Sequence, residues 1–296
     1  MLRIIADSTC DISKEDARKM GIQIVPISVR FGDEEFLDGV EITHEEFYTR
    51  LAECDELPKT SQPSPDTFMK VFNEAVAAGD DVLGIFISSD LSGTYQSACL
   101  AALDVEEETR KKLYMVDSRS ASIGTALLIR EAVKLRDAGV NVSDIAAACT
   151  EMSKYIKLTA VVGSLKYLKM GGRLSGAAAF AGTMLHITPV VSIEDGKVVV
   201  IGKTRGKKAA EKLMHDKLIK DGLSLTRDFM FGHINCSESL ETFINKSLTY
   251  ISDVNGNVGV SSIGCSVGTH VGPGTYGIAY VEAAESGMNR ESIVKT

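Results

Sequence analysis

The feature that most constrains the fold is a repeated order of strand, polar loop and helix through the first half of the chain. Short runs with the composition of β-strands predict strands at 2–6, 22–29, 81–88 and 112–116. Helical patterns lie between and after them, at 43–53, 66–78, a segment opening at 91–94, 121–138 and 143–155. Strands that alternate with helices in this way are typical of a parallel α/β sheet.

The second half of the chain has a different pattern. Its predicted strands are 158–162, 190–193, 197–201, 229–234, 258–263 and 275–281. Its predicted helices are 164–170, 177–185, 206–220 and 237–250, with a loop at 264–274. Glu194-Asp195-Gly196 joins two of the strands and is a β-hairpin signature. We therefore expect a parallel-sheet lobe at 1–157, a mixed α/β lobe at 158–282 and a polar tail at 283–296, two domains being usual at this length.

Composition disfavours several classes of protein. A net charge of −8 and the absence of Trp disfavour general nucleic-acid binding, which depends on phosphate contacts and stacking. No apolar run approaches the ~20 residues of a spanning helix, and the N-terminus meets a charge too early for a signal peptide. The six cysteines form no CxxC pair, so we expect reduced thiols in a cytoplasmic protein.

Charge is distributed unevenly along the chain. Residues 152–212 contain 11 Lys and Arg against three Asp and Glu, a net charge of +8 in a chain whose total is −8. Such a segment is either a solvated basic face or a docking surface for an acidic partner or a phosphorylated product.

Several common enzyme signatures are absent. The chain has no GxGxxG motif after a strand and no histidine pair at metal-ligand spacing. A P-loop-like stretch begins at Gly196, but five residues separate it from Gly202 where the motif requires four. Asp7 and Asp11 could hold a cation, although a helix cap at Asp11 is the simpler interpretation. We expect no catalytic residue, no metal and no cofactor.

Hydroxyl-bearing residues cluster at the predicted starts of two helices. Thr60 and Ser61 precede one helix, and Ser92 and Gly93 open the next. Helix N-termini expose unpaired N–H groups and a partial positive charge, so neutral hydroxyls there suit a carboxylate or phosphate. Each residue alone is equally an ordinary helix cap. His270, among nearby glycines, is either a further hydrogen-bond donor to an anion or a structural histidine bonded to backbone.

The apolar segment at 177–185 adds a second property. A helix that is apolar on all sides is buried in a core or lines an apolar cavity, and its small residues would leave room for a chain. An anion-binding end and an apolar tunnel, without a nucleophile–base pair, favour a protein that binds an amphipathic acid.

These motifs resemble those of the DegV family of bacterial fatty-acid-binding proteins. The resemblance covers about residues 1–282 and implies two α/β lobes with a long-chain fatty acid held between them. The matching segments, in family order, are Asp7-Ser8-Thr9, Thr60-Ser61-Gln62-Pro63-Ser64, Leu91-Ser92-Gly93-Thr94-Tyr95, Asp117-Ser118, Gly171-Gly172-Arg173-Leu174-Ser175 and His270-Val271-Gly272-Pro273-Gly274.

The resemblance also implies roles for individual residues. The carboxylate is expected at the interlobe cleft and the acyl chain in the second lobe. A separate ATP-dependent kinase subunit would phosphorylate the carboxyl group for phospholipid synthesis, and Arg173 is expected to engage that subunit. Two alternatives stay open: a self-contained acyl or phosphoryl transferase using Ser92 and His270, or a passive lipid carrier. The expected carboxylate ligands are Thr60, Ser61, Ser92, His270 and the backbone N–H of Gly93.

Overall fold

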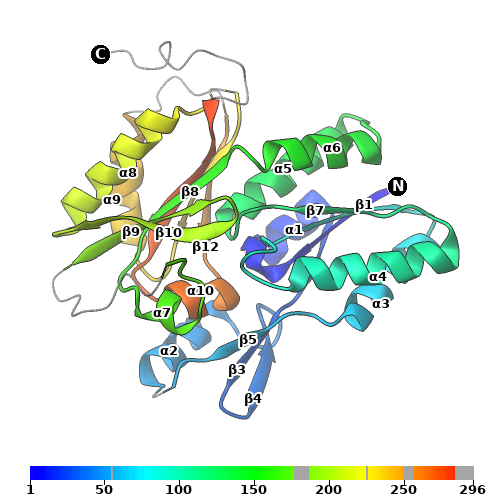
Figure 1. Ribbon diagram of the computed structural model, residues 1–296, viewed down its shortest axis with the longest axis horizontal. Coiled ribbons are helices and arrows are strands. Elements are labelled where there is room, and N and C mark those ends of the chain that lie inside the picture. The colour runs from blue at the N-terminus through cyan, green and yellow to red at the C-terminus, as the bar shows by residue number, and fades with distance from the viewer. Residues whose placement is uncertain (55, 177–186, 225, 250–255, 284–296) are drawn as a thin grey trace.

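The computed structural model describes residues 1–54, 56–176, 187–224, 226–249 and 256–283. They form a four-stranded parallel sheet, a six-stranded mixed sheet and a small three-stranded antiparallel sheet. Figure 1 shows the first two side by side, with the small sheet below the parallel one. The fold is therefore the predicted α/β class, with a parallel N-terminal sheet and a mixed C-terminal sheet. The boundary near 157 stays a prediction, and the predicted helix at 177–185 and most of the tail lie outside the described residues.

The parallel sheet is buried on both faces. Alternate residues of β1 face opposite sides, so Ile4 packs toward α5 and α6 while Ile5 packs toward α3 and α4. Burial on both faces explains why these strands are continuous apolar runs in the sequence. The strand order is β2-β1-β6-β7, formed by β1 (Leu2–Asp7), β2 (Ile22–Val25), β6 (Asp81–Phe86) and β7 (Tyr114–Asp117). The helices are α1 (Lys14–Met20), α3 (Pro65–Ala77), α4 (Thr94–Thr109), α5 (Ile123–Asp137) and α6 (Val142–Met152).

The single strand predicted at 22–29 is wrong, because the chain forms two strands there. β2 ends at Val25, and β3 (Ser28–Phe31) begins after Pro26 in the small sheet, with β4 (Glu34–Leu37) and β5 (Lys59–Ser61). Proline has no N–H to donate to a ladder, so the first sheet ends at this point. α2 (His44–Glu53) follows β4, and the Oγ1 atom of its N-cap Thr43 accepts from the Glu46 N–H as predicted.

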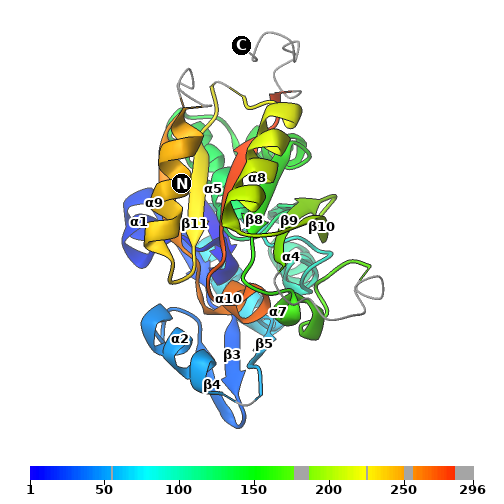
Figure 2. The ribbon, with the colours of Figure 1, turned by 90° about the vertical axis from the view of Figure 1, so that its left-hand side faces the viewer.

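The mixed sheet has one face covered by helices and one face toward the first lobe. Figure 2 shows α8 (Lys207–Asp221) and α9 (Ser237–Leu248) lying against this sheet. The predicted hairpin is confirmed between β9 and β10, where Asp195 and Gly196 both have positive φ, as a tight primed turn requires. The strand order is β10-β9-β8-β13-β11-β12, formed by β8 (Ile156–Val161), β9 (Thr188–Glu194), β10 (Lys197–Thr204), β11 (Phe229–His233), β12 (Val258–Ser262) and β13 (Tyr276–Val281).

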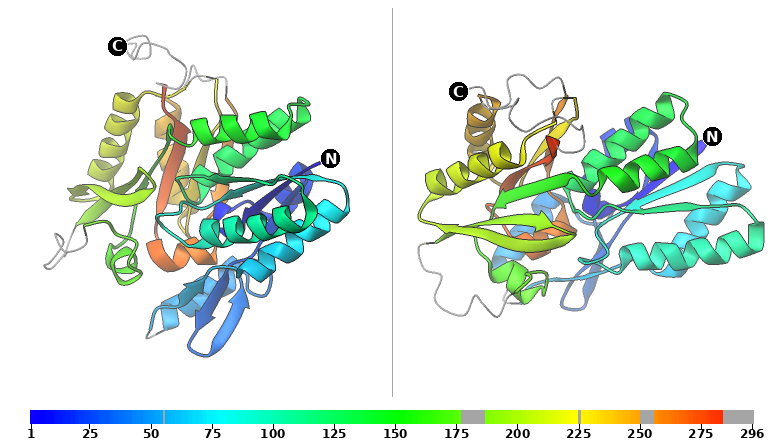
Figure 3. Two further views of the ribbon diagram at one scale, coloured as in Figure 1. Left: turned by 45° about the vertical axis from the view of Figure 1, so that its right-hand side comes forward. Right: turned by 45° about the horizontal axis from the view of Figure 1, so that its top comes forward.

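Three helices lie where the two large sheets approach each other. α5 contacts strands of both sheets, and Figures 1 and 3 show it between them. α7 (Lys166–Met170) and α10 (Cys265–Val271) contact each other and lie on the side of the mixed sheet opposite α8 and α9.

The predicted loop at 264–274 is also wrong, since most of it forms α10. Gly264, Gly268 and Gly272 recur every fourth residue, a spacing that places them along one side of a helix. A Cβ atom added to Gly268 would lie 2.2 Å from the Tyr48 hydroxyl, and one added to Gly272 would lie 2.3 Å from the Tyr167 ring. These glycines therefore allow close packing of two tyrosines rather than an irregular loop.

Two buried carboxylates from the first lobe cap the start of α10. Asp38 accepts from the N–H groups of Cys265 and Ser266, both at 3.1 Å, and Asp11 accepts from Gly264 N–H at 2.8 Å. The next helix along the chain, α1, is capped by Ser13, so Asp11 does not cap the helix that its sequence position suggests. It accepts instead from Gly264, the N-cap residue of α10, 253 residues away. Asp7 instead accepts from the N–H groups of Thr9 and Ile87 within the first lobe.

Replacing Asp38 by alanine should destabilise the protein more than a surface substitution does. The change leaves two helix N–H groups buried without acceptors, so we expect the free energy of unfolding to fall by about 1–3 kcal/mol. Urea denaturation measures it. Asp33→Ala, at an exposed turn position, is the matched control and should change stability by less than about 0.5 kcal/mol. Equal losses in the two variants would contradict the capping role.

Candidate ligand-binding cavity

A cavity lies between the lobes, and one of its walls is a face of the mixed sheet. Leu158, Ala160 and Val162 line it from β8 and the residue that follows, while Val191 and Ile193 line it from β9. Because side chains alternate along a strand, Val161 on β8 points to the opposite face and packs beneath α8 and α9. The cavity wall is therefore an apolar surface held in place by a sheet that is covered on its other side.

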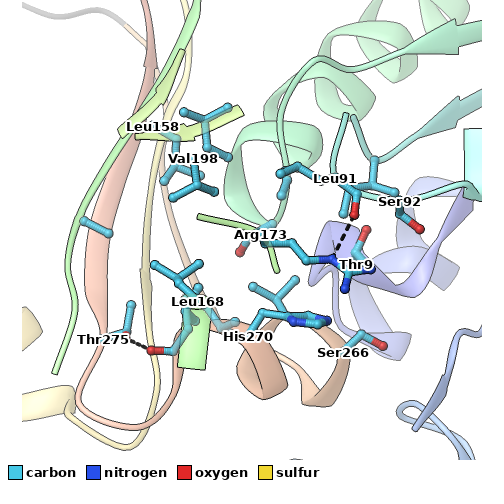
Figure 4. A pocket seen from close by; sticks show the side chains of 18 of the residues that line it. Thr9, Leu91, Ser92, Leu158, Leu168, Arg173, Val198, Ser266, His270 and Thr275 are labelled. Atoms are coloured by element: carbon cyan, nitrogen blue, oxygen red, sulfur yellow. Dashed lines mark hydrogen bonds between the residues drawn. The ribbon is translucent and has the colours of Figure 1, made fainter. Parts of the chain in front are cut away.

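The opposite end of the cavity is polar. Figure 4 shows Thr9, Ser92 and Ser266 grouped on the side of the first lobe, whereas Leu158 and Val198 lie on the other side. His270 and Arg173 lie between these groups. The cavity is thus amphipathic along its length, with an apolar part against the second lobe and hydrogen-bonding groups toward the first.

Four of the six residues expected from the sequence line this cavity, and two do not. Thr60, Ser92, Arg173 and His270 are lining residues. Ser61 follows Thr60 on β5, so strand alternation directs it away, and it is exposed. Gly93 is the N-cap of α4 and packs under the Gln62 amide, where an added Cβ would lie 2.2 Å from Oε1.

His270 and Thr60 form a hydrogen-bonded pair at the cavity wall. Thr60 Oγ1 and His270 Nε2 are 3.0 Å apart. The other ring nitrogen, Nδ1, is buried without a described partner and faces Gly171, whose added Cβ would lie 2.3 Å from it. A buried N–H without an acceptor is costly, so the proton belongs on Nε2, which donates to Thr60. The Thr60 hydroxyl proton is then free to point toward a ligand.

The imidazole of His270 is neutral at physiological pH. Burial, with the nearby charge of Arg173 as a second cause, lowers the pKa of His270 to about 4. The pair therefore offers uncharged hydrogen-bond donors rather than a cation.

Arg173 reaches into the cavity from the Gly-rich segment that follows α7. Its Nε donates to the Leu91 carbonyl at 3.2 Å and its Nη1 to the Gly171 carbonyl at 2.5 Å. The side chain is half-buried, and no carboxylate in the described ranges forms an ion pair with it. Arg173 is consequently a cation at the edge of the cavity whose charge has no described counterpart.

Five polar lining residues were not among the expected site residues: Thr9, Gln62, Ser122, Ser266 and Thr275. The Thr275 hydroxyl donates to backbone carbonyls of Val271 and Gly272. The hydroxyls of Thr9 and Ser122 donate to the buried carboxylates of Asp7 and Asp11, so their protons are already used. Ser266 differs, because its Oγ is buried and has no described partner. It lies one helical turn before His270 on α10, a spacing that becomes informative only once this segment is known to be helical.

The sequence matches a family model described as "Uncharacterised protein, DegV family" over residues 1–283. The chain belongs to the DegV family. A DegV domain-containing protein of Clostridium perfringens is 35% identical over 290 residues, covering 95% of this chain and 98% of that protein. A relative from Clostridium acetobutylicum is 35% identical over 289 residues, covering 94% and 97% respectively.

Several solved structures resemble this one closely. A DegV family protein of Thermus thermophilus, described as fatty-acid-binding, has a TM-score of 0.84 and 31% identity, covering 95% of this chain and all of that one. A stearic-acid-binding protein of Eubacterium ventriosum has a TM-score of 0.84 and 29% identity, covering 97% and 100%. Bacillus subtilis DegV, described as a fatty-acid-binding protein, has a TM-score of 0.82 and 28% identity, covering 95% and 99%. None of the helices in the described ranges is long and apolar enough to span a membrane.

The lowered pKa of His270 should appear in the pH dependence of stability. A histidine in the unfolded chain titrates near ~6.5, so the unfolded state binds more protons than the folded state between that pH and about 4. The free energy of unfolding should fall as pH falls through this window. His270→Gln should remove this part of the fall while leaving the contributions of other histidines unchanged. Parallel stability curves for the two proteins from pH 7 to pH 4.5, measured by urea denaturation, would contradict it.

Proposed function

We propose that this protein binds a long-chain fatty acid in the interlobe cavity, with the acyl chain against the sheet wall and the carboxylate at the polar end. The observation that carries the proposal is the amphipathic cavity itself, apolar along β8 and β9 and polar near Ser92 and Ser266, with Thr60 beside His270. Several similar solved structures are described as fatty-acid-binding, which supports it. The lobes at 1–157 and 158–282 are proposed as the two sides of this site.

The two ends of the cavity contribute in different ways. Burying an acyl chain against the apolar wall stabilises the complex by about 0.8 kcal/mol per methylene, so the chain supplies most of the affinity. A carboxylate removed from water costs several kcal/mol unless it is hydrogen-bonded, so the polar end determines which head group is accepted.

The head-group site offers neutral donors. The Thr60 hydroxyl is free to donate because His270 already donates to its oxygen. Ser92 lies at the N-terminal end of the 16-residue helix α4, where the helix dipole favours an anion. Ser266 contributes a buried hydroxyl with no described partner in the protein. Ser61 is exposed, and neither Ser61 nor Gly93 lines the cavity, so their expected roles receive no support from the cavity geometry.

We further propose that the bound acid is presented to a separate ATP-dependent kinase subunit, in the cytoplasm, which forms an acyl phosphate for phospholipid synthesis. Neutral donors hold the carboxylate without cancelling its charge, so an oxygen stays nucleophilic toward a phosphate donor. Arg173, which lies in the basic segment at 152–212, supplies positive charge at the cavity for an acidic partner or a phosphorylated group.

The alternative of a transferase using Ser92 and His270 is less well supported. Ser92 Oγ pairs with Thr94 Oγ1 at 2.8 Å, and His270 pairs with Thr60. In the described part of the chain, no hydrogen bond joins Ser92 to His270, as a nucleophile and its base would require. A passive carrier needs the same cavity and differs only in lacking a kinase partner.

The binding proposal predicts a head-group effect of Ser266. Delipidated protein should bind hexadecanoic acid saturably with one molecule per chain, as followed by titration and by mass spectrometry of a solvent extract. Ser266→Ala should weaken this binding by roughly tenfold or more, the effect of one hydrogen bond to a charged group. Binding of hexadecanol should change much less. Ser61→Ala is the matched control and should leave both affinities unchanged. The absence of saturable binding to wild-type protein would overturn the proposal.

The kinase proposal predicts activity only in a mixture. The fatty-acid-loaded protein, ATP and the ATP-binding subunit from the same organism should together yield acyl phosphate, trapped with hydroxylamine as the hydroxamate. Neither protein alone should yield it. Product formed by this chain alone would support the transferase instead, and no product in the mixture would leave the passive carrier as the better description.

A further inference from the structure

A second cavity adjoins the first at the Thr60–His270 pair. It is lined by Pro58 and Lys59 before Thr60 and by Met170 at the end of α7, and its volume is about 560 Å³. Lys59 and Met170 are exposed, so this cavity faces the outside of the molecule. Thr60, Arg173 and His270 line both cavities. These three residues therefore form a shared wall, with the two cavities on either side of it.

The second cavity has an excess of positive charge. Arg173 carries five N–H donors, of which the described hydrogen bonds use two, and no described carboxylate pairs with it. Lys59 also forms no described ion pair, while its backbone is held in β5 opposite Arg30. Glu56 is the acidic residue among those that line the cavity. Two cations against one carboxylate leave this space suited to an anion.

We propose that the second cavity binds the phosphoryl group of an acyl phosphate whose acyl chain occupies the first cavity. The proposal rests on the fatty-acid-binding function proposed above. In the phosphorylation step a carboxylate oxygen attacks the γ-phosphorus of ATP, a new O–P bond forms, and the bond to the β-phosphate oxygen breaks. ADP leaves with the electron pair. The added group then lies on the side of the shared wall away from the acyl chain.

The recognition chemistry favours a phosphoryl group over a second carboxylate. The planar guanidinium of Arg173 suits the bidentate geometry of phosphate oxygens. Lys59 lines the second cavity but is not among the residues that line the first. It is therefore placed to contact the added phosphate rather than the fatty-acid carboxylate. Because Arg173 lines both cavities and Lys59 lines only the second, a change at Lys59 can separate binding of the phosphoryl group from binding of the carboxylate.

The test compares hexadecanoic acid with its stable acyl-phosphate analogue, a β-ketophosphonate in which a methylene replaces the bridging oxygen. Each displaces a fluorescent fatty acid from delipidated protein. Lys59→Glu should weaken binding of the analogue by about tenfold, because an attraction between Lys59 and the phosphonate is replaced by a repulsion. The affinity for hexadecanoic acid should change by less than about twofold. Lys166→Glu makes the same charge change at an exposed position of α7 outside both cavities, and should alter neither ligand by more than about twofold.

Each other outcome has a distinct meaning. If wild-type protein fails to bind hexadecanoic acid, the proposed function itself is wrong. If the acid binds but Lys59→Glu leaves the analogue unaffected, or weakens both ligands equally, only the phosphoryl site is overturned. A final arm titrates ATP into fatty-acid-loaded protein, where we expect no saturable binding. Saturable ATP binding that Lys59→Glu abolishes would overturn the assignment to an acyl phosphate and would indicate that the second cavity binds a nucleotide.

Discussion

The contact on which the site depends is the capping of α10 by two carboxylates from the other lobe. A seven-residue helix containing a glycine is too short to be stable alone, because helix nucleation is unfavourable and propagation adds little over so few residues. Asp11 and Asp38 supply acceptors for its first N–H groups. Tyr48 also donates from its hydroxyl to the Ile263 carbonyl just before the helix. The contact between the lobes therefore also fixes α10, and with it the orientation of Ser266 and His270.

The other end of α10 shows how charge is arranged around the cavity. His270 meets Thr60, 210 residues away, and lies over Gly171, where no side chain intervenes. Burial keeps the imidazole neutral, so the head group meets hydroxyls and N–H groups first. Arg173 adds its charge at the boundary with the second cavity. An anion placed there is attracted by the charge of Arg173, but its first hydrogen-bond partners are neutral. This arrangement is compatible with later chemistry at the carboxyl group.

The predictions that succeeded rest on local signals, and those that failed depend on distant contacts. The Thr43 cap and the turn at Asp195 and Gly196 are fixed by neighbouring residues, so the sequence revealed them. Pro26 marked the break between β2 and β3, a local signal that the strand prediction overlooked. α10 could not be recognised in the same way, because its glycines make room for Tyr48 and Tyr167 from remote segments. Ser266 stands in a local GxSxG pattern at 264–268, but its place in the cavity wall depends on the same remote contacts.

The cavity itself follows from tertiary structure that no periodicity reveals. On β8 both Leu158 and Val161 are apolar, so alternation alone does not tell which face is packed under helices and which borders the cavity. The wall belongs to a hydrogen-bonded sheet covered by α8 and α9, and it therefore exists without a ligand to order it. The polar end is different, since Thr60, Ser92 and Ser266 come from three separate segments that the lobe contact brings together. Affinity for the chain should therefore tolerate changes at the lobe contact far better than recognition of the head group does.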